Sequence, residues 1–218
     1  RALLLHTNLL HFSQITQHFL SKHPNGLEIV ASLHKKYVEL IQQYIGPTGG
    51  DMLKYTTDRL VFYWSIPSNN AEDYLAELCR IIVYQLVKLR EALLYQLQYE
   101  EISPGINFIL TTGNLSIVLL GHSNEDRKLQ RMPYEYTYAG QSFLESLEDN
   151  LEQTENMSIY VNNAIGEKIN WCFYLQEAQQ TTPAQSSRSD YYETKPSKFF
   201  AVKNLKENVG KVPSVDPL

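Results

Sequence analysis

The sequence contains no run of eighteen apolar residues, so no segment is long enough to cross a bilayer as a helix. It also lacks a G-x-S-x-G pattern and a P-loop, which argues against the serine hydrolases and P-loop nucleotidases that those motifs mark. Its first residues, Arg1 to Leu5, include neither a Met nor a cleavable signal pattern. We therefore expect them to form the first strand of a domain within a longer polypeptide.

Cysteine is scarce, and positive charge does not exceed negative charge. The two cysteines, Cys79 and Cys172, lie far apart in apolar stretches, which predicts buried free thiols in a reducing compartment. The formal net charge is -5, with 19 basic and 24 acidic residues, which argues against nucleic acid as the main partner. Five of the six histidines fall in the first quarter of the chain, but their spacing is not that of a zinc site.

Hydrophobic periodicity predicts helices and hairpins in the first half of the chain. Two turn signals, Thr57-Asp58 and Gly113-Asn114, each separate a pair of β-rich runs. We expect both hairpins to belong to one central sheet, with helices packed on one face. The predicted helices cover 12–23, 27–45 and 71–97, and the predicted strands cover 2–7, 52–56, 59–64, 106–112 and 115–120.

The second half of the chain continues this mixed pattern. The predicted elements are an edge strand at 134–138, a helix from Gly140 to about 152, a strand at 159–161, a helix at 163–169, and strands at 170–177 and 199–202. Residues 122–135 are polar, and residues 179–196 are rich in Gln, Thr, Ser and Pro, so both are predicted loops. This order of predicted helices and strands along the chain predicts an α+β domain over residues 1–205, with a linker at 206–218.

Residues 49–64 read GGDMLKYTTDRLVFYW and resemble the segment G-G-D-I/M-L-K-F-A-G-D-A-L-L-x-x-W of class III nucleotidyl cyclases. Residues 4–13 occupy the place of that family's F-x-D-I-x-G-F-T. Residues 113–121 resemble its second hairpin, and residues 138–141 resemble its V-I-G-Q. The similarity runs in order from about residue 2 to 175, and the first catalytic half of the soluble adenylyl cyclases is the nearest match. The resemblance implies a cyclase-like (ferredoxin-like) fold.

The family's chemistry, as the resemblance implies it, needs two such domains placed head to tail with a nucleotide between them. One domain supplies two aspartates that hold two magnesium ions on the triphosphate. Two metals can stabilise both the attacking and the leaving oxygen of an in-line displacement. The other domain supplies an Asn and an Arg for the developing charge.

This chain departs from that plan. Asp58 matches the hairpin aspartate, but the first-strand aspartate falls on Asn8. A unit-charge pair at close range is worth about 4 kcal/mol at an effective dielectric constant of 20, so the loss should weaken metal binding strongly. Residues 9–11, Leu-Leu-His, replace small residues that let backbone N–H groups approach the phosphates. Leu144 and Glu148 stand where the complementary domain would carry its Asn and Arg.

Lys54 matches the lysine that the resemblance assigns to bicarbonate binding. Its usual arginine partner falls near Leu147, so an anion clamp is incomplete. The alternative is that Lys54 is an ordinary surface cation.

These departures leave three hypotheses. The first is a degenerate adenylyl cyclase-like domain that acts as an interaction module in the cytoplasm, by resemblance in a ciliary axoneme. Its partner would be a second cyclase-like domain or a scaffold protein, contacted through Leu9, Leu10 and Leu144, unless these leucines fill the domain's own core. The second is an active half, using magnesium and completed by a partner domain. The third is a sensor that binds ATP without turnover.

Overall fold

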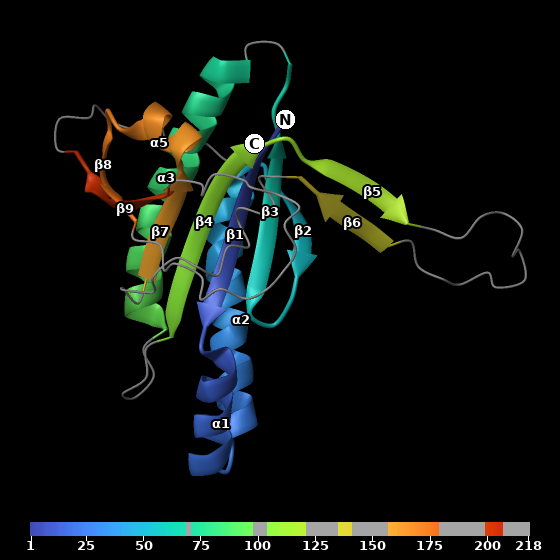
Figure 1. Ribbon diagram of the computed structural model, residues 1–218. Helices are drawn as coiled ribbons and strands as arrows, with labels where there is room; N and C mark the ends of the chain where they lie inside the picture. The colour runs from blue at the N-terminus through green and yellow to red at the C-terminus, as the bar shows by residue number, and fades with distance from the viewer. Residues whose placement is uncertain (69–70, 98–103, 121–134, 141–156, 179–198, 207–218) are drawn as a thin grey trace, which may run out of the picture.

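The computed structural model describes residues 1–68, 71–97, 104–120, 135–140, 157–178 and 199–206 (Figure 1). Its helices are α1 (Phe12–Lys22), α2 (Gly26–Ile45), the short 3-10 helix η1 (Gly46–Thr48), α3 (Ala71–Gln96) and α5 (Asn163–Ile169). Its strands are β1 (Ala2–Leu10), β2 (Asp51–Tyr55), β3 (Arg59–Ser65), β4 (Gly105–Gly113), β5 (Ser116–Leu120), β6 (Glu135–Ala139), β7 (Met157–Asn162), β8 (Phe173–Glu177) and β9 (Phe199–Leu205).

Seven of these strands form one sheet in the order β2-β3-β1-β4-β7-β9-β8. All neighbours are antiparallel except β4 and β7, which are parallel. Strand β1 lies inside the sheet, and all but one of its residues are buried, as its apolar sequence predicts. The fold class expected from the sequence, α+β with a mostly antiparallel sheet, is confirmed.

The helices α2, α3 and α5 share one hydrophobic core on one face of the sheet, and α2 and α3 lie behind the strands in Figure 1. Helix α3 presents one apolar stripe, which includes Leu75, Ile82, Leu86 and Leu93, to alternate residues of the strands. Ile15 and Phe19 of α1 pack against Ile29 and Val30 of α2. Among the described elements, α2, α3 and α5 therefore pack on one face of the sheet, as expected from the sequence.

The opposite face of the sheet carries a row of polar side chains at one level. Asn8 of β1 lies opposite Arg59 of β3 and also opposite Asn107 of β4, which in turn lies opposite Ser158 of β7. Directly opposed residues point to the same face, so these four side chains line up across four strands. This line of polar side chains begins at Arg59, beside the turn between β2 and β3.

The predicted pairing of residues 106–112 with 115–120 is wrong. Strand β5 pairs with β6 in a separate two-stranded sheet, which projects away from the seven-stranded sheet in Figure 1. The physical reason is that β4 is already hydrogen-bonded on both sides, to β1 and to β7, and has no edge left for β5.

Three further expectations concern the cysteines, the segments after residue 121 and membrane-spanning helices. Cys79 and Cys172 are buried and free, as predicted. The expected helix after Gly140 and the expected loops at 122–135 and 179–196 lie in part or whole outside the described residues. Among the helices of the described ranges, none is long and apolar enough to cross a membrane.

Candidate functional site

An open cleft of about 430 Å³ lies where β1 ends, α1 begins and β2 turns into β3. Residues 8–14 and 57–59 line it. The backbone N–H of Leu9 donates to the carbonyl oxygen of Asp58, with 2.7 Å between nitrogen and oxygen. Together with the opposition of Asn8 and Arg59, this bond brings Asn8 and Asp58 to the same end of the sheet. The two positions that the resemblance assigns to metal ligands are therefore neighbours in space.

The carboxylate of Asp58 already has partners within its own turn. Thr56 Oγ1 donates to Asp58 Oδ1 at 3.0 Å, and Arg59 Nε lies 3.6 Å from Asp58 Oδ2. The Asp58 and Arg59 side chains are 41% and 37% exposed, so both meet the solvent of the cleft. Arg59 was not among the predicted site residues, although its departure from the family segment could have pointed to it. Arg59 stands at the place of an alanine in the family segment.

His11 closes the turn between β1 and α1 in a left-handed backbone conformation, with φ 58° and ψ 23°. In the family pattern this position is a glycine, the residue that adopts positive φ without a Cβ penalty. Helix α1 then starts without a side-chain cap and without an acidic residue in its first turn. A residue with a Cβ therefore adopts the left-handed conformation that glycine adopts most easily.

Leu9 and Leu10 do not form a contact surface. Leu9 is only 5% exposed and belongs to the main hydrophobic core, and Leu10 is 7% exposed. The partner contact predicted for these two residues is wrong, and the alternative that they fill the domain's own core applies. Leu9 lies on the face of the sheet that α2 and α3 cover, and Leu10, the next residue of β1, is buried on the opposite face. Leu144, Leu147 and Glu148 lie outside the described residues.

Lys54 is exposed on β2, at the edge of the sheet and next to a β-bulge. The cleft lining does not include it.

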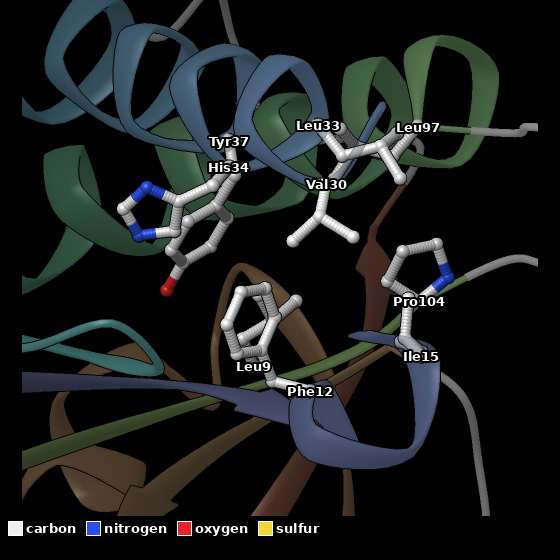
Figure 2. Close-up of a pocket in the computed structure, with 9 residues that line it drawn as sticks. All are labelled: Leu9, Phe12, Ile15, Val30, Leu33, His34, Tyr37, Leu97 and Pro104. Carbon is white, nitrogen blue, oxygen red and sulfur yellow. The ribbon is translucent and has the colours of Figure 1, made fainter. Parts of the chain in front are cut away.

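A small apolar cavity lies behind the cleft, between β1, α1 and α2 (Figure 2). Leu9 and Phe12 line both spaces and separate them. The cavity has about 10 Å³, room for one water molecule at most. On its wall, Tyr37 shares a 2.7 Å hydrogen bond with Thr7 Oγ1, and burial raises the pKa of Tyr37. The cavity is too small for a cofactor, so the open cleft remains the candidate site.

The residues of the cleft do not fit a pair of divalent ions. In the described part of the chain, no group of three or more His, Cys, Asp or Glu side chains could hold a metal ion. The buried Oδ1 of Asn107 has no hydrogen-bond partner and is an oxygen that a cation could use. However, Asn107 lies two strands, or about 9.5 Å, away from β3. Arg59 places a positive charge directly beside the remaining carboxylate.

No family model and no curated protein sequence matches this chain. Solved structures do match. The adenylyl cyclase CyaB from P. aeruginosa has a TM-score of 0.66 at 15% identity, over 96% of each chain. The guanylate cyclase domain of RhGC from Catenaria anguillulae, solved with GTP, has a TM-score of 0.59 at 12% identity, over 94% of this chain and 97% of that one.

A third match is the non-canonical dimeric guanylyl cyclase domain of RhoGC from Blastocladiella emersonii. Its TM-score is 0.57 at 12% identity, over 94% of this chain and 97% of that one. These matches span adenylyl and guanylyl cyclases alike, and each covers nearly the whole of both chains. Over almost its full length, the chain has the fold of the catalytic domains of adenylyl and guanylyl cyclases.

Proposed function

We propose that this chain is a degenerate cyclase domain that serves as an interaction module and does not form cyclic nucleotides. The observation that carries the proposal is the pairing of Asp58 with Arg59, next to a neutral Asn8. Two-metal catalysis needs hard anionic oxygens facing the ions. These three side chains carry no net charge together.

The size of the effect follows from Coulomb's law. A unit charge pair at 4 Å is worth about 1 kcal/mol in bulk water and about 4 kcal/mol at an effective dielectric constant of 20. Because Asp58 and Arg59 are partly exposed, each charge change here lies between these limits. A divalent ion at Asp58 loses the attraction of one carboxylate at position 8 and meets the repulsion of Arg59. Both changes oppose metal binding.

The interaction role rests on the fold. The described strands and helices keep the cyclase fold, although the ligand charges are not kept. One structural relative is described as a dimeric guanylyl cyclase domain, and by analogy we propose a second cyclase-like domain as the partner. Sedimentation velocity over a range of concentrations tests whether a second copy of this chain fills that role. The ciliary setting rests on the sequence resemblance alone, and imaging of tagged full-length protein tests it.

An activity assay tests the catalytic part of the proposal. With ATP or GTP and either Mg²⁺ or Mn²⁺, we expect no cyclic nucleotide from the chain. The double variant Asn8→Asp/Arg59→Ala should gain Mn²⁺ binding measured by calorimetry, because it restores the second carboxylate and removes the opposing cation. Cyclic nucleotide formation by the unmodified chain that is lost in Asp58→Ala would instead establish the active half as the correct alternative.

A further inference from the structure

We infer that the exposed aromatic side chains at the start of β8 form a docking site for residues 207–213 of the same chain. Trp171 lies in the turn between α5 and β8, and Tyr174 lies on β8 itself. The two residues are 59% and 55% exposed. Two large aromatic side chains that meet water this close together are typical of a contact site. The inference is independent of the proposed function, because it does not involve the cleft.

The pairing of β8 with β9 directs the next residues of the chain towards this site. Phe173 lies opposite Leu205 in an antiparallel register, and the backbone N–H of Lys206 donates to the carbonyl oxygen of Cys172 at 2.9 Å. In such a register, each later residue on one strand lies opposite an earlier residue on the other. One further step along the same register brings residue 207 level with Trp171.

The side chain of Lys206 fixes the start of the segment beside the aromatic rings. Its Nζ donates to the carbonyl oxygen of Asn170 and lies 5.6 Å from the centroid of the Tyr174 ring, within the range of a cation–π interaction. These two contacts fall on either side of Trp171 in the sequence. Because the segment starts next to the rings, little loop-closure entropy opposes its docking there.

The residues that follow Lys206 have side chains that suit aromatic rings. Residues 207–213 read ENVGKVP, and their apolar members are Val209, Val212 and Pro213. Proline-containing extended segments bind surfaces lined by aromatic rings. At about 3.1 Å per residue, this segment reaches about 22 Å from Lys206, whereas the three residues from Trp171 to Tyr174 span about 10 Å. The segment is therefore long enough to cross both rings.

Acrylamide quenching of tryptophan fluorescence tests the inference on the full chain. Trp171 and the buried Trp64 are the two tryptophans of the sequence, so a Trp171→Phe variant gives the contribution of Trp64 for subtraction. The triple variant Val209→Ser/Val212→Ser/Pro213→Ser removes the apolar side chains of the docking segment. We expect its Trp171 quenching constant to rise at least about twofold, since a segment that covers the indole for more than half of the time at least halves its collisions with acrylamide.

The matched control carries three comparable changes beyond the docking segment, Val215→Ser/Pro217→Ser/Leu218→Ser. It should leave the quenching constant of Trp171 unchanged. Circular dichroism and the quenching of Trp64 show whether each variant is folded.

The reciprocal measurement changes a ring and follows the segment. Trypsin cleaves after lysine, and Lys211 lies inside the docking segment. Trp171→Ala should speed cleavage after Lys211 at least about twofold, followed by mass spectrometry, because an undocked segment is open to the protease for more of the time. Tyr95→Ala, which removes an exposed aromatic ring from α3, is the control and should leave this rate unchanged.

Unchanged quenching in the first triple variant, an equal rise in both triple variants, or unchanged cleavage in Trp171→Ala would each overturn the inference. Protection of Trp171 that increases with protein concentration would overturn it too, since a second copy of the chain would then cover the rings.

Discussion

His11 holds a backbone conformation that costs a residue with a Cβ about 1–2 kcal/mol. Histidine tolerates it better than most residues, but glycine tolerates it best. We expect His11→Gly to be more stable than His11→Ala by about 1 kcal/mol, because only the glycine variant relieves the strain. Urea unfolding followed by circular dichroism measures the difference.

The comparison between the two variants removes the contribution of the histidine side chain, which both lack. Gln17→Gly and Gln17→Ala form the matched control pair, at an exposed position in the middle of helix α1. There the order should reverse, since alanine favours a helix over glycine by about 1 kcal/mol. Equal stability of His11→Gly and His11→Ala would show that the left-handed turn is not strained.

Burial raises the pKa of the Cys79 thiol to about 12. In the folded chain the thiol therefore keeps its proton to higher pH than in the unfolded chain. Its contribution to stability is complete below about pH 8.5 and is lost progressively as the pH rises towards 12. We expect the stability advantage of the unmodified chain over Cys79→Ala to be about 1–2 kcal/mol smaller at pH 10 than at pH 7.5.

Urea unfolding at the two pH values checks this prediction. The alanine variant is the reference at each pH, so titration of other groups cancels. A difference that does not change with pH would contradict the burial of the thiol.

At the scale of single residues, the sequence identified part of the site. Asn8 and Asp58 could be found because each stands at a fixed place in a recognisable pattern, and the fold brings them together. Leu9 and Leu10 were assigned to an interface because a sequence does not say whether the rest of the domain covers the side chains on each face of a strand. The effect of Arg59 on its neighbour depends on an interatomic distance that the pattern does not contain.

Helix α3 provides a test at the scale of an element. Leu86 is completely buried between the helix and the sheet, whereas Tyr95 on the same helix is 85% exposed. Leu86→Ala should lower the free energy of unfolding by about 2–5 kcal/mol, through lost burial and the cavity that remains. Tyr95→Ala is the control and should change it by less than about 0.5 kcal/mol. Similar losses in both variants would mean that α3 does not pack on the sheet by this stripe.

The elements themselves were largely predictable from periodicity. Helices α1, α2, α3 and α5 begin and end within a residue or two of their expected bounds, since their apolar stripes and flanking turn residues are local signals. The pairing of β5 was not predictable in this way. The dipeptide Gly113-Asn114 indicates a turn, but the partner of the following strand depends on which sheet edges are already occupied.

At the scale of the whole molecule, β9 joins the edge strand β8 to the rest of the sheet. It lies between β7 and β8, and β8 has no other neighbour in the sheet. The side chain of Arg90 on α3 also donates to the backbone carbonyl oxygens of Val202 and Lys203, at 3.3 Å and 2.8 Å. A chain that ends at residue 198 should lose cooperative unfolding, because buried residues of β7 and β8 would face water. Thermal unfolding followed by calorimetry measures this.

A chain that ends at residue 206 is the control, since it keeps every strand of the sheet. It should unfold in one transition, like the full chain. A single sharp transition in the chain that ends at 198 would show that the sheet is stable without β9.

The place of β9 also has a consequence for synthesis on the ribosome. Strand β8 precedes β9 in the chain, so it leaves the exit tunnel first and has no partner among the described strands until β9 follows it. The seven-stranded sheet can therefore be completed only after residues 199–205 have been translated and have left the tunnel. Within this chain, the last strand to be made therefore sets the moment at which the domain becomes resistant to proteases.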